Sequence, residues 1–494
     1  MSWSQIYNDC YQEILKELTR LDGIAVGFNT NVDAIIEFNS TTILELIGKV
    51  GLNSLTLFER VLKWKGVIDK PADFVVGLCG CFEKGKASEW LIQNDETYLY
   101  LLNNLPVPNS FRLGGQAGIM ANILAEFGVQ QVIVHSATLS DQLTNLFIKK
   151  KNLVIPYYDK KGKLIFINPR KLKVEDQRFY YHIIAEIKKN DTLHFGDTIK
   201  WKCPRDNRFI ATYDPPNFEM QLMDAFQKDI ELIAERVNGF IISGFHMLEQ
   251  KMLGKTAINE KINSVISLIE RAKKQNPTLI VHLELSSTKN EFIMEQLYKI
   301  SIKGQYWDSI GCNERELIEL LKAIGEKKLA NDLNKDFQQE NVLLGCIKVC
   351  EKLNLKRFHL HQFGCYILIL NKEYAIDREL HRNSLCFASL AATEKALTGE
   401  ILQAYNLILE QPSFSEKISK TFRELAKYIT ASESYIKANF LSNGFAETPD
   451  YLICAIPSII VDKPVFTVGL GDTISSTALA AELALRKRYL KNKK

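Results

Sequence analysis

Apolar and polar positions in the second half of the chain follow a repeating order of short strands and longer helices. Apolar runs at 239–244 and 277–286 have the length of buried strands, and 259–275 between them has helical spacing. The order continues through 306–313, the strand-like runs "KRFHLHQ" and "CYILIL", and a helix at 384–399. It predicts an α/β fold with a mostly parallel sheet flanked by helices. Ligands bind such sheets at the carboxyl ends of the strands, so polar residues there are candidate site residues.

The first half of the chain is less regular. A strand with a polar exit is predicted at 23–35, and a loop, helix and strand at 114–136. We expect a large α/β nucleotide-binding and catalytic domain formed by residues 1–35, 111–149 and 211–494. The irregular stretches 36–110 and 150–210 contain short strand-like pieces and are expected to form a smaller, discontinuous β-containing lid.

Composition is that of a globular chain with a sizeable core, with 46% hydrophobic and 24% charged residues. Charges interrupt every apolar run before about eighteen residues, so no transmembrane helix and no membrane partner is expected. The net charge of +4 is scattered along the chain and does not favour nucleic acid. Ten cysteines, several in apolar surroundings, predict buried, reduced thiols in a cytoplasmic protein. We expect a monomer or a small homo-oligomer.

Polar residues follow two of the predicted strands. His282 and Glu284 alternate in "HLELS" and therefore project from the same face of a strand. Asn313 and Glu316 have the spacing of a helix capping box. Each pattern also has a purely structural interpretation, as a strand end in contact with solvent and as a capped helix start. Carboxylates and an amide at adjacent strand ends together suit Mg²⁺, which usually retains several waters.

Two segments of the first half are suited to hydroxyl groups. Asn31 and Asp33 lie on one side of the extended segment "NVD", and amides and carboxylates commonly hold polyols, although an Asx turn is an alternative. In "RLGGQAG", Gly114 and Gly115 permit a close backbone approach immediately before a helix. The free N–H groups of that helix favour anions or hydroxyl oxygens.

The segment "TVGLGDTISS" carries a candidate catalytic group. Gly469, Leu470 and Gly471 lead into a helix that is predicted to begin near Asp472. Successive N–H groups at such a turn form an anion-binding concavity, which the helix dipole reinforces. A proton-accepting carboxylate beside an anion site is what phosphoryl transfer to an alcohol requires. Taken alone, the motif also fits an ordinary Asp cap after a glycine turn.

The ordered set of motifs resembles the ADP-dependent sugar kinases, the glucokinases and phosphofructokinases of the ribokinase-like superfamily. The resemblance covers nearly the whole chain. It is carried by "GFNTNVDAI", "GKASE", "RLGGQAGIMAN", "DNRFIATYDPPN", "SGFHML", "HLELSS", "GCNERE" and "TVGLGDTIS". It implies a ribokinase-like large domain with a lid, and transfer of the β-phosphoryl of ADP to glucose or fructose 6-phosphate with release of AMP.

The resemblance also implies roles for individual residues. Asp472 would be the catalytic base, and the N–H groups of Leu470, Gly471 and Asp472, after the turn at Gly469, would form the anion hole. Mg²⁺ would be held, mostly through waters, by Glu284, Asn313 and Glu316. Arg208 matches an arginine that binds the nucleotide phosphate, and the adenine slot is expected near His361. The positions expected to hold the sugar are Asn31, Asp33, Glu89, Gly114, Gly115, Gln116 and His182.

Several alternatives stay open at this level. Glu89 matches a glutamate associated with glucose, whereas a sugar 6-phosphate would need a cation such as Lys171, Lys173, Arg178 or Arg205. An ATP-dependent kinase of the same superfamily, acting on a nucleoside or another alcohol, is a second hypothesis. A non-catalytic sugar- or nucleotide-binding regulator is a third. The long lid insertions argue against the second, and a base beside a metal site argues against the third.

Overall fold

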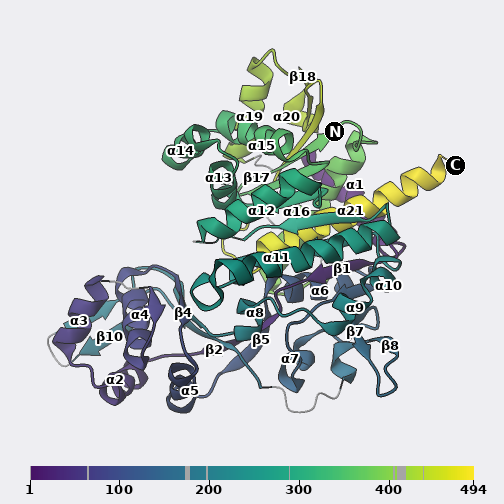
Figure 1. Cartoon of the computed structure of the whole chain (residues 1–494). Coiled ribbons are helices and arrows are strands. Elements are labelled where there is room, and N and C mark those ends of the chain that lie inside the picture. The colour runs from purple at the N-terminus through teal and green to yellow at the C-terminus, as the bar shows by residue number, and fades with distance from the viewer. Residues whose placement is uncertain are drawn as a thin grey trace.

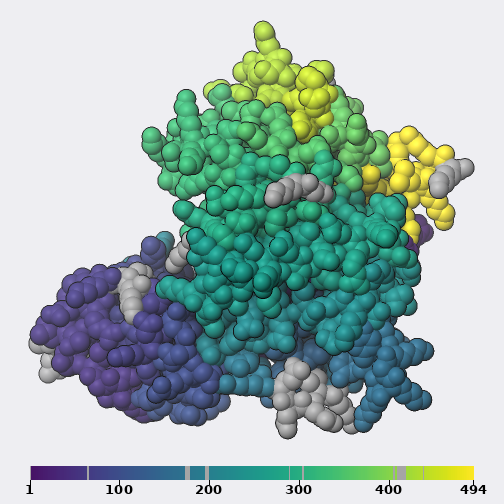
Figure 2. Space-filling view, in the orientation of Figure 1, coloured from purple at the N-terminus to yellow at the C-terminus, as the bar shows by residue number. Residues whose placement is uncertain are grey.

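Two large β-sheets, and a separate two-stranded one, organise the described part of the computed structural model of the chain (Figure 1). The structure describes residues 2–63, 66–172, 178–195, 199–286, 288, 290–403, 407–408, 419–437 and 439–493. Each large sheet has its own buried hydrophobic cluster, so the chain forms a large body and a smaller lid. The lid, drawn in purple, projects from one side of the body in the space-filling view (Figure 2).

The body is built on a twelve-stranded sheet of order β18–β19–β20–β17–β16–β15–β14–β13–β1–β6–β7–β8. Its centre is parallel and almost entirely buried, as expected where helices cover both faces. The parallel strands are β1 (Ile24–Gly27), β6 (Val132–Val134), β7 (Leu153–Tyr158), β13 (Gly239–Ile242), β14 (Ile280–Glu284), β15 (Ser309–Cys312) and β16 (Arg357–Gln362). The antiparallel margins are β8 (Leu164–Ile167), β17 (Cys365–Asn371), β18 (Ile436–Lys437), β19 (Phe445–Glu447) and β20 (Tyr451–Pro457).

Helices cover the two faces of this sheet. One layer consists of α1 (Trp3–Leu18), α6 (Gln116–Glu126), α16 (Arg378–Thr398) and α21 (Leu470–Asn492), which pack against one another. The other consists mainly of α11 (Gln250–Gln275), α12 (Glu291–Gly304), α13 (Glu314–Ala323) and α15 (Gln339–Leu353) (Figure 1). Shorter elements are α7 (Asp141–Leu146), η1 (Pro169–Lys171), α8 (Pro215–Phe218), α9 (Asp224–Lys228), α10 (Ile230–Ala234), η2 (Phe245–Met247), α14 (Lys327–Lys335), α19 (Lys420–Ala431) and α20 (Phe440–Asn443). The predicted α/β fold class is confirmed.

The lid is a six-stranded sheet with helices of its own. Its order is β3 (Val67–Ile68), β4 (Ser88–Ile92), β12 (Asn207–Thr212), β9 (His182–Ile187), β2 (Asn31–Ile36) and β5 (Ser110–Gly114). It also contains α2 (Ser40–Lys49), α3 (Ser54–Lys63), α4 (Pro71–Lys84), α5 (Asp95–Asn104) and the hairpin of β10 (Thr192–Phe195) and β11 (Ile199–Lys202). The chain therefore passes between the sheets at β1–β2, β5–α6, β8–β9 and β12–β13.

Strand pairing gives the lid other boundaries than the sequence analysis expected. Residues 153–167, which were assigned to the lid, form β7 and β8, and Leu153 pairs with Val132 at the edge of the large sheet. Conversely, the lid sheet begins at Asn31 and extends to Gly114. The described residues of the stretch 36–110 form four helices. The nearly uninterrupted burial of α4 explains why its sequence shows no helical period.

All ten cysteines lie within the described residues, and each is buried and free of a disulfide. In the part of the chain that the structure describes, no helix combines the length and the apolar character needed to cross a bilayer.

Candidate active site

The first turn of α21 is shaped by two glycines. Gly469 precedes the helix with a left-handed φ of 66°, and a Cβ there would lie 2.9 Å from a side-chain carbon of Ile119. A Cβ on Gly471 would lie 3.1 Å from Cε1 of His361. Side chains at either position would crowd the turn. The N–H groups at the start of α21 therefore stay accessible beside the partly buried carboxyl of Asp472.

The surroundings of Asp472 raise its pKa above the value of an aspartate in water. Burial raises its pKa, and the nearby charge of Glu284 raises it further. Lys395 and a hydrogen bond from Gln116 act in the opposite direction, and the resulting pKa is about 6. Asp472 is thus ionised at neutral pH and is a much stronger proton acceptor than an ordinary aspartate.

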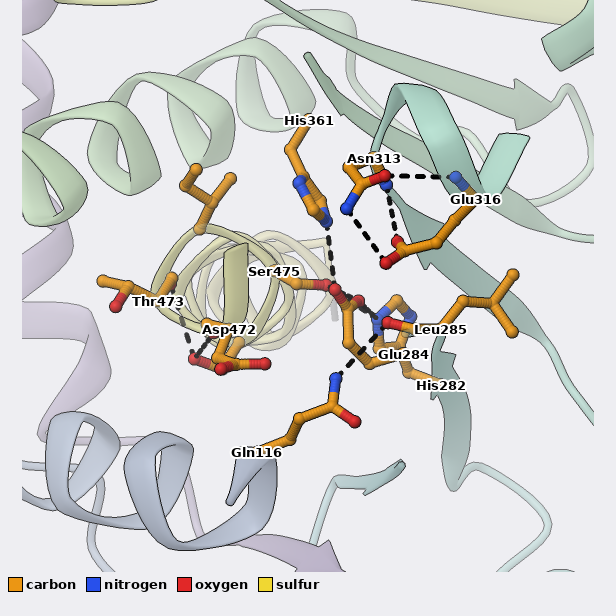
Figure 3. Close-up of polar contacts among 12 residues, drawn as sticks. Gln116, His282, Glu284, Leu285, Asn313, Glu316, His361, Asp472, Thr473 and Ser475 are labelled. Carbon is orange, nitrogen blue, oxygen red and sulfur yellow. Dashed lines mark hydrogen bonds and ion pairs between the residues drawn. The ribbon is translucent and has the colours of Figure 1, made fainter. Parts of the chain in front are cut away.

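Glu284, at the end of β14, lies at the centre of a buried hydrogen-bond network (Figure 3). Nε2 of His282 lies 3.2 Å from its Oε2, and Nε2 of His361 lies 3.0 Å from its Oε1. The hydroxyl of Ser475, on α21, also donates to Oε2. Burial alone would raise the pKa of Glu284, but these two histidines hold it at about 2. Glu284 is therefore a permanent anion at the carboxyl edge of the sheet.

Asn313 and Glu316 form the predicted capping box at the start of α13. The Asn313 side chain accepts hydrogen bonds from the N–H groups of Arg315 and Glu316, and the Glu316 carboxylate accepts from the Asn313 backbone N–H at 2.9 Å. Burial raises the pKa of Glu316 to about 7, and the charges of Glu284 and Asp472 contribute to this rise. The predicted capping box is confirmed, and it directs a second carboxylate toward Glu284 (Figure 3).

This arrangement fits a magnesium ion held through waters. Three carboxylates from β14, α13 and α21 face one region (Figure 3), and in two of them burial, with a smaller contribution from the negative charge of the others, raises the pKa. Both oxygens of Glu284 and of Glu316 already accept hydrogen bonds. Among the described residues, no three acidic, His or Cys side chains converge tightly enough to bind a metal directly. Mg²⁺ commonly binds in this way, with few direct protein ligands and several retained waters.

The predicted sugar residues of the lid also come together. Nδ2 of Asn31 donates to Oδ1 of Asp33 at 2.8 Å and lies 3.1 Å from Nδ1 of His182. Nε2 of His182 lies 3.5 Å from Oδ2 of Asp214. Burial lowers the pKa of His182, but Asp214 and Asp33 outweigh that effect and raise it. Amide, imidazole and carboxylate groups are thus gathered at the junction of lid and body.

Gly114 and Gly115 must lack side chains because Asn31 packs closely against both of them. A Cβ on Gly114 would lie 2.6 Å from Nδ2 of Asn31, and one on Gly115, whose φ is 75°, would lie 2.6 Å from Oδ1 of Asn31. Gln116, at the start of α6, donates to the carbonyl of Leu285 at 3.3 Å. It also contributes the hydrogen bond to Asp472. Gln116 therefore links the glycine pair to the end of β14 and to the first turn of α21.

Glu89 and Arg208 lie on neighbouring lid strands. Glu89 accepts a hydrogen bond of 2.7 Å from the hydroxyl of Thr212, and its charge raises the pKa values of Asp33 and His182. Arg208 lines a cavity of about 780 Å³ between lid and body, together with Asp33 and, from the body, Lys395 and Phe466.

The described cations considered for a sugar 6-phosphate have protein partners or line another cavity. Arg178 forms an ion pair of 2.6 Å with Asp95, and Arg205 donates to the carbonyl of Gly85 at 2.6 Å. Lys171 lines a separate basic cavity beside β8. Lys173 lies outside the described residues.

Some members of the site were not identified from the sequence. The sequence analysis expected the adenine slot near His361, which stays a prediction, but it did not anticipate that Nε2 of His361 lies 3.0 Å from Glu284. Ser475 and Lys395 were missed. Ser475 lies one helical turn after Asp472, and this spacing could have indicated that both face the strand ends. Lys395 and its neighbour Glu394 form a charged pair in the otherwise mostly apolar run "SLAATEKAL", and this pair was the available signal.

Comparisons with known proteins agree with this geometry. Residues 22–481 match the model of the ADP-specific phosphofructokinase/glucokinase conserved region. The chain is 30% identical to an ADP-dependent glucose/glucosamine kinase of Pyrococcus furiosus, over 98% of this chain and 99% of that protein. It is 28% identical to an ADP-specific phosphofructokinase of Methanosarcina acetivorans, over 98% of each.

Solved structures give the same result. The last common ancestor of ADP-dependent phosphofructokinases from Methanosarcinales superposes with a TM-score of 0.83 at 30% identity, over 98% of both chains. An ADP-dependent kinase in complex with fructose 6-phosphate and ADPβS superposes with a TM-score of 0.78 at 29% identity, again over 98% of both chains. The chain belongs to the ADP-specific phosphofructokinase and glucokinase family and is an ADP-dependent phosphotransferase with an alcohol acceptor.

Proposed function

We propose that the chain transfers the β-phosphoryl group of ADP to a hydroxyl of glucose or fructose 6-phosphate and releases AMP. Relatives over the full length are named for these acceptors, and one similar structure holds fructose 6-phosphate with an ADP analogue. The observation that carries the mechanism is the position of Asp472. Its carboxyl has a raised pKa and lies in the first turn of α21, where backbone N–H groups are free to bind an anion.

The acceptor is held at the junction of lid and body. Asn31, Asp33 and His182 offer donors and acceptors close together, and Gln116 extends this set toward Asp472. Such groups fix a polyol by paired hydrogen bonds and orient one hydroxyl for reaction. Glu89 supports glucose as an acceptor through the resemblance of "GKASE" to the family's motif.

The Asp472 carboxylate takes the proton of the acceptor hydroxyl as the sugar oxygen attacks the β-phosphorus. The bond between that phosphorus and the oxygen bridging to the α-phosphate breaks, and AMP leaves with its electron pair. Backbone N–H groups of Leu470, Gly471 and Asp472 donate to the oxygens of the moving phosphoryl group. Arg208, on the lid side of the cavity, would bind a nucleotide phosphate.

Glu284, Asn313 and Glu316 would hold Mg²⁺ through waters. When bound, the ion would supply positive charge that neutralises the diphosphate. Glu284 stays ionised for this purpose because His282 and His361 donate to it. Contact of the lid with the body would exclude water from the reacting groups and limit hydrolysis of ADP.

Asp472→Asn tests this proposal. We expect turnover to fall by about 10²–10⁴-fold while the fold and ADP binding are retained, because only the proton acceptor is lost. Asp9→Asn, on the exposed face of α1, is the matched control. Both variants and the unaltered protein are assayed with ADP or ATP against glucose and fructose 6-phosphate. Activity with ATP alone contradicts the donor, and near-normal turnover of Asp472→Asn contradicts the base.

A further inference from the structure

Lys395 is a buried lysine that the mechanism above does not use. It lies near the end of α16, and only 6% of its surface is exposed. Its ammonium donates to the carbonyl of Gly469 over a long 3.4 Å. That carbonyl already accepts from the backbone N–H of Thr473 at 3.0 Å and from its hydroxyl at 2.7 Å. Within the described residues, no carboxylate forms an ion pair with Lys395, so most of its donor capacity is unused.

A buried charge is costly when its partners are weak, and Lys395 has only the long hydrogen bond to Gly469 and the Phe466 ring, whose centroid lies 5.9 Å from Nζ. The N-terminus of α21 carries a partial positive charge, and it lies directly beside the ammonium. Burial lowers the pKa of Lys395 to about 8, and Asp472 opposes this effect only in part. The ammonium is therefore still mostly protonated at neutral pH. An anion that lies between the Lys395 ammonium and the N-terminus of α21 would stabilise both positive groups.

The open side of Lys395 faces the cavity between lid and body. Arg208 lines the same cavity from the lid, and Val468 and Phe466 line it from the segment that leads into α21. A Cβ on Gly469 would lie 3.1 Å from Nζ of Lys395, so the glycine also leaves space around the ammonium. A phosphate group at the start of α21 would thus meet the helix N–H groups and the Lys395 ammonium together.

We propose that Lys395 binds the β-phosphoryl group of ADP and completes the anion site at the start of α21. The assignment rests on the proposed function. Lys395 stays protonated throughout and donates hydrogen bonds to phosphoryl oxygens, whereas the proton of the acceptor goes to Asp472. As the phosphoryl group moves from AMP to the sugar oxygen, the ammonium remains beside its equatorial oxygens and stabilises the charge that develops there.

Binding of ADP compared with AMP tests the assignment, because AMP lacks the β-phosphoryl group. Calorimetric titrations with Mg²⁺ compare the unaltered protein, Lys395→Met, Lys395→Gln and Lys395→Arg. Lys395→Gln keeps a donor for the Gly469 carbonyl but loses the charge. Lys491→Met, at the exposed end of α21, is the matched control.

We expect Lys395→Met and Lys395→Gln to weaken ADP binding by about 10- to 100-fold, the range for a lost charged hydrogen bond, with AMP binding changed less than about threefold. Lys395→Arg should keep most of the preference for ADP. If Lys395 only supports the turn at Gly469, Lys395→Gln binds ADP normally, or ADP and AMP binding fall by the same factor. Either result overturns the assignment. An unaltered protein without ADP-dependent turnover overturns the proposed function and this assignment with it.

Discussion

Turnover is expected to depend on one ionisation near pH 6, that of Asp472. Burial and the charge of Glu284 raise this pKa from 3.8 to about 6. The carboxyl accepts a proton only when ionised, so the rate falls as pH drops through the pKa of the bound enzyme. At pH 5, about one Asp472 carboxyl in eleven would be ionised, compared with more than nine in ten at an ordinary pKa. The rate at pH 5 should therefore lie below its plateau, at about a tenth of it where the pKa stays at about 6 in the bound enzyme.

The assay is kcat measured at saturating sugar and ADP from about pH 4.5 to 8.5 at constant ionic strength. Terminal phosphates also titrate near pH 6, so ADP binding is measured over the same range to separate that effect. Lys395→Gln tests the direction in which the pKa of Asp472 shifts. The Lys395 charge lowers the pKa of Asp472, so its removal should move the acidic limb to higher pH.

Two results would refute this reasoning. One is a rate that stays at its plateau down to about pH 4.5, since Asp472 would then have an ordinary pKa. The other is an acidic limb that persists unchanged in the residual activity of Asp472→Asn, which would assign the ionisation to another group.

Three further perturbations have defined outcomes. Arg357→Met should lower the free energy of unfolding by about 3–5 kcal/mol in urea titrations, because Glu482 loses its buried ion-pair partner at 2.9 Å. The double variant Arg357→Met with Glu482→Leu should recover most of the lost free energy. A loss below about 1 kcal/mol in Arg357→Met contradicts the prediction. Gly115→Ala should raise the KM for sugar about tenfold by displacing Asn31, whereas Gly162→Ala, with a φ of 74° and open space, should not. Chelation of Mg²⁺ should abolish turnover reversibly without a change in circular dichroism, and full activity in chelator contradicts the metal site.

The sequence predicted most of the body because its short strands are largely apolar runs that alternate with longer helices. The strands ending at Glu284 and Cys312 were located by their apolar runs, and the capping box of Asn313 and Glu316 followed from spacing alone. The lid was harder to predict. The helix α4 is buried on nearly every side and so has no polar face, and the β7–β8 hairpin joins the body through pairing with β6. Pairing between distant strands leaves no mark in local periodicity.

Contacts between residues that are distant in the sequence also could not be predicted in the candidate site. Individual residues such as Asn31, Asp33 and Asp472 could be proposed from type and position, but their neighbours depend on tertiary packing. The contact of His361 with Glu284 joins residues 77 positions apart, and the bond between Asn31 and His182 spans 151. The raised pKa values of Asp472 and Glu316 arise mainly from burial in the folded chain, with a contribution from carboxylates that are distant in the sequence. No spacing rule within one segment contains that information.

The points at which the chain passes between its two large sheets coincide with the proposed acceptor site, and this couples acceptor binding to the position of the lid. Asn31 starts the first lid strand, Gly115 follows the last residue of β5, and His182 begins β9. These are the residues proposed to hold the sugar, so the acceptor would touch the hinge itself. Binding of the acceptor and the position of the lid relative to the body would then be coupled equilibria. By linkage, whatever factor the acceptor adds to the binding of ADP, ADP must add to the binding of the acceptor, whichever of the two binds first.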